Sequence, residues 1–199
     1  MSAGEIIITD KLVKAEFVLE KNGTDGFSNS GDSIDTQIGP SWWHGYFATE
    51  RNSIATARKW SAWGDRRREH GHTFTAFRLF RAKPGGVAGN ADGSLTISVD
   101  AANYEITLGG LGTGQVRIGD MISWRTLASG FCCVQAQEDA DPAAGSLTVA
   151  VTPRPMAAHA TPAVRRFQAL AEFKLTTPLP PFEDMIDRRI EFEATQVIR

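Results

Sequence analysis

From Val116 to Pro155 the chain reads VRIGDMISWRTLASGFCCVQAQEDADPAAGSLTVAVTPRP. This stretch contains three short apolar runs, and residues that favour turns separate them. In the last run, SLTVAVT, leucine and valine alternate with smaller or polar residues, which is the period of two of a β-strand. The segment 139–145 before it contains Pro142 and Gly145, two residue types that favour turns. Because proline cannot donate a ladder hydrogen bond, we expect a small antiparallel unit that ends at Pro153.

The rest of the chain shows the same alternation of short strands and turns. About ten short strands and one helix indicate a mainly β fold, a sandwich or a barrel. The 199 residues suit a single domain, 1–199, with a loop or insertion around 85–115. The expected strands are Glu5–Thr9, Lys14–Glu20, Ser41–Ala48, Thr73–Phe80, Leu95–Val99, Tyr104–Leu108, Met121–Arg125, Phe131–Gln137, Ser146–Thr152, Glu172–Leu175 and Arg189–Ile198.

A helix is expected from Ile54 to Trp63, after a cap at Asn52 or Ser53. Its apolar residues recur every three positions and include both Trp60 and Trp63, so we expect the two tryptophans to pack on the β-structure. Gly64 fits the end of this helix.

Two further segments have weaker patterns. Residues 161–171 could form a second short helix with Pro162 in its first turn. Residues 22–31 are polar and rich in glycine, which favours a loop.

The net charge, the N-terminal residues and the two cysteines argue against a nucleic-acid binder, a signal peptide and a disulfide. The net charge is −2, which does not indicate a general nucleic-acid binder. The N-terminal residues have no basic region followed by an apolar core, so we expect no signal peptide. Cys132 and Cys133 are adjacent and point to opposite faces of a strand, so we expect two reduced thiols rather than a disulfide.

Three histidines are the main candidates for catalytic chemistry. His70 and His72 could share a face with each other, and His44 could supply a third metal ligand, as in a metal-dependent hydrolase. The helical His-Glu-x-x-His pattern is missing from the sequence, and a polar turn explains His70 and His72 equally well. We therefore expect a protein that is not an enzyme and has no cofactor and no metal.

Aromatic and basic residues suggest a surface for another molecule. Trp42, Trp43 and Tyr46 place aromatic rings on both faces of one strand, which is typical of a central strand or an interface. Residues 66–68 are three arginines that could meet an acidic neighbouring subunit or DNA phosphates, or could simply be solvated. The candidate subunit interface consists of Trp42, Trp43, Tyr46, Arg66, Arg67 and Arg68.

The order of these parts resembles a known family. A Gly-Asp pair, two short strands, an acidic turn and a Gly-x-Leu-x-Val-x-Val-x-Pro strand resemble the second half of distal tail proteins of long-tailed (siphovirus-like) bacteriophages and related tail-like particles. The preceding half is similar too, with a Gly-Pro-x-Trp strand, a tryptophan-containing helix and a phenylalanine-rich strand. The resemblance covers roughly Gly39 to Pro155.

The resemblance implies a structural virion protein with a tail-tube-type β fold and a flanking helix. Such proteins form a ring, usually a hexamer, that connects the tail tube to the baseplate hub at the tail tip. The implied partners are other copies of the chain, the tail tube protein and the baseplate hub protein. DNA passes through the lumen only as cargo, and no membrane is involved. The implied location is the virion tail, assembled in the host cytoplasm. A tube or tail-terminator protein of the same β lineage is the alternative.

Overall fold

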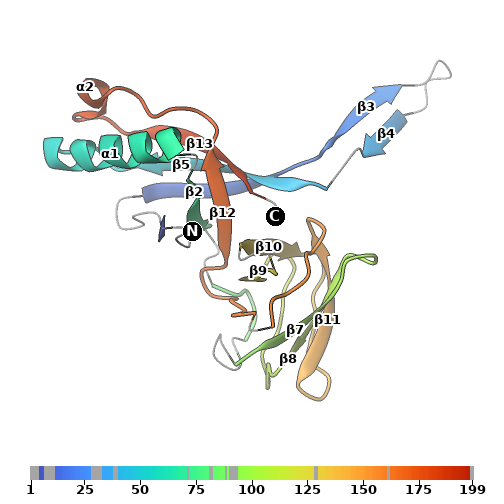
Figure 1. Cartoon of the computed structure of the whole chain (residues 1–199). Coiled ribbons are helices and arrows are strands. Elements are labelled where there is room, and N and C mark those ends of the chain that lie inside the picture. The colour runs from blue at the N-terminus through green and yellow to red at the C-terminus, as the bar shows by residue number, and fades with distance from the viewer. Residues whose placement is uncertain are drawn as a thin grey trace.

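The computed structural model of the chain is mainly β, as the sequence predicts (Figure 1). It describes residues 5–6, 12–27, 33–37, 40–70, 72–80, 83–87, 89, 94–127, 130–160 and 162–197. The strands form a six-stranded sheet, a five-stranded sheet and a separate two-stranded arm. The longer helix lies along the six-stranded sheet, and the five-stranded sheet lies on the other side of the molecule in Figure 1.

The first sheet has the order β1-β6-β12-β13-β5-β2. Its strands are antiparallel except for β1 and β6, which are parallel. The sheet curls, so that the Leu79 amide just after β6 donates to the Ala15 carbonyl of β2 over 3.1 Å. The strand bounds are β1 Glu5–Ile6, β2 Leu12–Glu20, β5 Trp42–Thr49, β6 Phe74–Phe77, β12 Leu170–Leu175 and β13 Glu191–Gln196.

Helix α1 (Ile54–His70) packs on this sheet through two tryptophans. Trp60 is 2% exposed and Trp63 is 7% exposed, which confirms the expectation that both rings are buried. The Trp60 ring lies 5.7 Å from Phe192 of β13, and the Trp63 ring lies 5.2 Å from Phe74 of β6, measured between centroids. The helix therefore spans several strands rather than one.

The prediction that the helix ends at Gly64 is wrong. The helix continues to His70, and Gly64 is buried inside it. A Cβ at position 64 would lie 2.7 Å from a methyl carbon of Leu179. The glycine therefore permits close approach of the 178–181 segment to the helix, a packing role that the local sequence does not reveal.

The second sheet contains the unit expected in the 116–155 stretch. Its order is β7-β8-β11-β10-β9, and all of its strand pairs are antiparallel. As expected, Gly145 takes a positive φ of 80° in the turn before β11, and β11 stops before Pro153. The bounds are β7 Thr96–Asp100, β8 Glu105–Gly109, β9 Met121–Arg125, β10 Phe131–Ala136 and β11 Ser146–Thr152. The range 85–115, expected as a loop or insertion, thus supplies β7 and β8.

Strand β10 connects the two cores of the molecule. Cys133 belongs to the hydrophobic cluster of the first sheet, whereas Cys132 belongs to that of the second. This arrangement confirms that the two neighbouring thiols point to opposite faces. The Trp43 indole on β5 donates to the Cys133 carbonyl over 2.8 Å, which joins the two sheets directly.

The third group of strands is an arm formed by β3 (Gly23–Phe27) and β4 (Ser33–Gln37). The two strands pair from Gly23 opposite Gln37 to Phe27 opposite Ser33. Figure 1 shows the arm extending past β2 and β5, away from both sheets. The expectation of a loop over 22–31 is therefore wrong for β3, because pairing with β4 overrides the low strand propensity of glycine and aspartate.

The second helix expected over 161–171 is also wrong. Arg165 pairs with Ser123 in a β-bridge, and β12 begins at Leu170. Ala163 and Gln168 have positive φ values, which a right-handed helix excludes. A short helix, α2 (Phe182–Met185), follows the prolines instead. In the portion of the chain that is described, neither helix is both long and apolar enough to cross a membrane.

Replacing Trp60 tests the packing of α1. Trp60→Ala removes a buried ring, so it should lower the free energy of unfolding by about 3–5 kcal/mol. Lys59→Ala, its exposed neighbour, should change stability by less than about 0.5 kcal/mol. Urea unfolding measures both variants, and a near-neutral Trp60→Ala would contradict the packing of α1 on the sheet.

Arg67 gives a second test. The sequence suggests a surface residue, but Arg67 is 6% exposed, and its guanidinium donates to the Thr73 carbonyl over 2.7 Å and lies over the Trp63 ring. Arg67→Ala should therefore cost about 1.5–3 kcal/mol, as expected for losing a hydrogen bond to a charged group. Arg68→Ala, on an exposed side chain, is the matched control for the same urea titration.

Candidate subunit interface

The three aromatic residues expected at the interface lie on different faces of β5. Trp43 is 2% exposed and belongs to the first core, so it is not available to another molecule. Trp42 and Tyr46 are half-buried on the opposite face, which is the outer face of the first sheet. Alternation along a strand accounts for the division, because neighbouring side chains point to opposite sides.

The three arginines at the end of α1 are also divided. Arg67 points into the fold, whereas Arg66 and Arg68 are exposed. The helical repeat explains this difference, since consecutive residues are separated by about 100° around the helix axis. Arg67 is therefore too buried to belong to the candidate interface, whereas Arg66 and Arg68 are accessible at the protein surface.

The outer face of the first sheet carries an organised polar cluster. His44 of β5 lies between two carboxylates, with Nδ1 3.2 Å from Glu20 and Nε2 3.2 Å from Glu193. Its ring is 4.7 Å from Tyr46. The Trp42 indole donates to the other carboxylate oxygen of Glu20 over 2.9 Å. These contacts fix the aromatic rings in place on a surface that faces away from the core.

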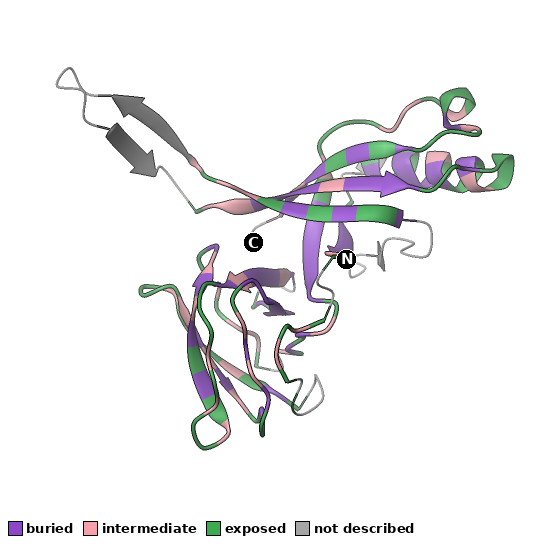
Figure 2. Ribbon diagram, turned by 180° about the vertical axis from the view of Figure 1, so that it is seen from behind, coloured by how far each residue is buried: buried purple, intermediate pink, exposed green. Residues whose placement is uncertain are grey.

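Strand register concentrates acidic side chains around Tyr46. Glu16 of β2 lies opposite Tyr46 on one side, and Glu193 of β13 lies opposite it on the other. Buried and exposed residues alternate along β2, so Glu16 is among its exposed residues (Figure 2). Beside Tyr46 is an acidic hollow of about 230 Å³, whose lining includes Lys14, Tyr46, Thr177, Glu191 and Glu193.

The three histidines are distributed over different elements. His44 is held on β5 by the two glutamates, His70 is the last residue of α1, and His72 is exposed before β6. Within the described ranges, no group of three or more histidine, cysteine, aspartate or glutamate side chains could hold a metal ion. The pairing of His44 with Glu20 and Glu193 depends on β2 and β13 and could not be predicted from β5 alone.

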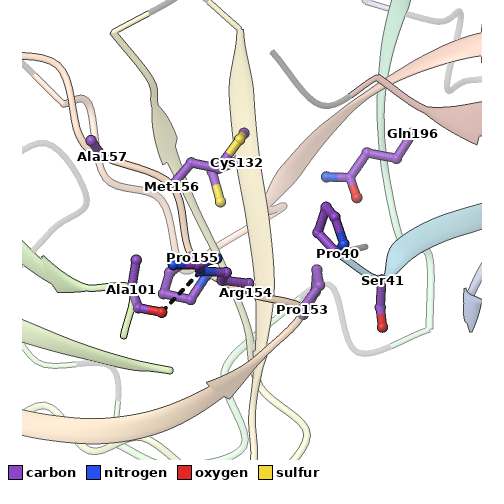
Figure 3. Close-up of a pocket in the computed structure, with 10 residues that line it drawn as sticks. All are labelled: Pro40, Ser41, Ala101, Cys132, Pro153, Arg154, Pro155, Met156, Ala157 and Gln196. Carbon is purple, nitrogen blue, oxygen red and sulfur yellow. Dashed lines mark hydrogen bonds between the residues drawn. The ribbon is translucent and has the colours of Figure 1, made fainter. Parts of the chain in front are cut away.

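A larger apolar pocket lies between the base of the arm and the second sheet. Its volume is about 340 Å³, and Arg154 at its edge donates to the Ala101 carbonyl over 3.1 Å (Figure 3). The lining includes two residues of nucleophilic type, Ser41 and Cys132. Burial raises the pKa of the Cys132 thiol to about 12, although a backbone hydrogen bond involving Met156 opposes the shift. The thiol is therefore protonated at neutral pH, which does not suit a nucleophile.

Comparison with known proteins adds no assignment: no family model matches the chain, and no curated protein matches it significantly.

Thiol reactivity tests the surroundings of both cysteines. Burial also raises the pKa of Cys133 well above its ordinary value, and the neighbouring Cys132 adds to the shift. The native protein should therefore react very slowly with a thiol reagent at about pH 8, whereas the protein in urea should react at both cysteines. Rapid modification of the native protein would contradict the burial of these thiols.

The same shifts predict how stability depends on pH. Both thiols stay neutral in the folded chain, whereas in the unfolded chain they ionise above the ordinary pKa of 9.0. Their contribution is fully present below pH 9.0 and is lost as pH rises toward the folded value of about 12 for Cys132. Replacing both cysteines with alanine should reduce the slope of unfolding free energy against pH in this range.

Proposed function

We propose that the chain is a structural protein of a bacteriophage tail tip and forms a ring that connects the tail tube to the baseplate hub. The observation that carries this proposal is the β3–β4 arm. Among the described residues, β3 and β4 pair with each other and join neither larger sheet. Figure 1 shows the arm projecting from the body of the molecule.

A two-stranded hairpin alone is marginally stable in water, so an arm of this kind gains stability when it lies on another protein surface. The available surface in a homo-oligomer is the neighbouring copy. A contact between the arm of one copy and the body of the next is head-to-tail, and such contacts close into a ring when the rotation allows it. The arm therefore supports an assembling protein more directly than a monomeric enzyme.

The sequence resemblance supports the specific role in a tail. The strands that carry it include β9, β10 and β11, and the helix with the two tryptophans is α1. By analogy, the ring is a hexamer, its partners are the tail tube protein and the baseplate hub protein, and DNA passes through its lumen. The same β lineage includes tube and terminator proteins. The form of the assembly, a closed ring or a tube, therefore distinguishes a distal tail protein from a tube protein.

Removing the arm tests the ring. Gly23 lies opposite Gln37, so residues 23–37 can be deleted at the point where the two strands of the arm lie side by side. Electron microscopy of the intact chain should show single closed rings, whereas the deletion variant should remain monomeric by light scattering. Because the arm lies outside both sheets, the variant should still unfold in urea in one cooperative transition, although its midpoint loses whatever stability the ring contacts add.

Three outcomes would count against this proposal. An intact chain that stays monomeric over a wide concentration range, even with tail partners present, would exclude a ring. Tubes of indefinite length would favour a tail tube protein instead. Antibodies against the chain that bind virions elsewhere than at the junction of tube and tip would exclude the distal position.

A further inference from the structure

Two exposed surfaces of the chain carry opposite charges. Arg58, Lys59 and Arg66 are exposed and form a broad basic stripe on α1. Lys59 and Arg66, seven positions apart, lie nearly in line, and Arg58 is offset from Lys59 by about 100° around the helix axis. This side faces away from the sheet, since the buried residues of α1 lie on the opposite side: Ala57, Trp60, Trp63, Gly64 and Arg67. Asp65, seven positions after Arg58, is exposed on the same side of the helix and offsets part of this charge, but basic residues outnumber acidic ones along α1.

The acidic hollow lies on a different surface, the outer face of the first sheet. Glu191 and Glu193 are exposed there beside the half-buried Tyr46. The cation at its edge, Lys14, lies 3.2 Å from Glu16, so an ion pair compensates its charge. The hollow therefore favours a positively charged occupant.

We propose that the acidic hollow of one copy binds an arginine side chain from the basic stripe of a second copy. The proposal rests on the ring described above and specifies one of its contacts. The donor is Arg58, with Lys59 next to it on the same stripe, and the acceptors are Glu191 and Glu193.

The chemistry of the hollow fits a guanidinium group. A planar guanidinium can stack on the Tyr46 ring and donate in parallel to a carboxylate, a combination that a compact ammonium group cannot match. Glu193 already contacts His44 through Oε2, and its side chain remains 48% exposed. A volume of about 230 Å³ is sufficient for one such side chain but not for a folded element.

The hollow is also partly organised before binding. His44 is held between Glu20 and Glu193 and lies against Tyr46, so two walls of the hollow are fixed by contacts within the chain. Side chains that are already fixed lose less conformational entropy when they bind. A neighbouring copy would thus meet a preformed acceptor rather than a set of mobile glutamates.

Charge also selects the symmetry of the contact. A two-fold dimer across either surface would place like charges together, which is unfavourable. Joining the basic stripe of one copy to the acidic hollow of the next pairs opposite charges through two different surfaces. Such a contact is heterologous and generates rings or filaments rather than closed dimers.

Charge reversal on each surface tests this contact in the full-length protein. The first variant carries Glu191→Arg and Glu193→Arg, and the second carries Arg58→Glu and Lys59→Glu. Each variant alone should weaken self-association by at least about tenfold in sedimentation experiments, because like charges now face each other. An equimolar mixture of the two should assemble again, since every contact between alternating copies pairs opposite charges.

The control is Glu138→Arg, a charge reversal at an exposed residue that follows β10 of the second sheet. This variant should leave assembly unchanged. Urea unfolding checks that each variant folds. If the variant with Glu191→Arg and Glu193→Arg does not fold, the milder pair Glu191→Gln and Glu193→Gln replaces it. If the intact chain forms rings that neither reversal weakens, this contact is wrong and the ring stands. If the intact chain forms no assembly, the proposed function fails together with the contact.

Discussion

A cluster of aromatic rings holds the first sheet and its helix together. Phe47 of β5 stacks on Phe192 of β13 at 5.1 Å and meets Phe173 of β12 at 5.5 Å, while Trp60 and Trp63 of α1 both lie against Phe192. The cluster requires Gly45, because a Cβ there would lie 2.6 Å from the Phe47 ring. By fixing which side of α1 faces inward, these contacts also leave the basic stripe on the outside.

The second constraint is β10, which serves two cores at once. Each of its faces is buried, one against the first sheet and one within the second, and the Trp43 hydrogen bond closes the junction. Burial raises the pKa of both thiols on this strand, so they stay protonated at neutral pH. The two sheets consequently act as one scaffold that carries the arm at one end and α1 at the other, as Figure 1 shows.

The surfaces that this packing leaves exposed have features suited to assembly. The arm extends beyond the sheets, the outer face of the first sheet gathers glutamates around Tyr46, and α1 presents arginines. Opposite charges on separate surfaces favour head-to-tail contacts over two-fold pairing. The proposed tail-tip ring combines these features. That the chain is not an enzyme stays a prediction from the sequence.

The sequence alone determined the mainly β class, the strands of the 116–155 stretch and the burial of Trp60, because periodicity and turn residues act within a few positions along the chain. Local patterns failed where distant segments decide the outcome. Gly64 marks a contact with Leu179 rather than a helix end, and β3 forms because β4 pairs with it. Only the tertiary structure placed Arg67 in the interior and brought Glu193 to His44, since these contacts join residues that are remote in sequence or depend on how α1 is rotated against the sheet.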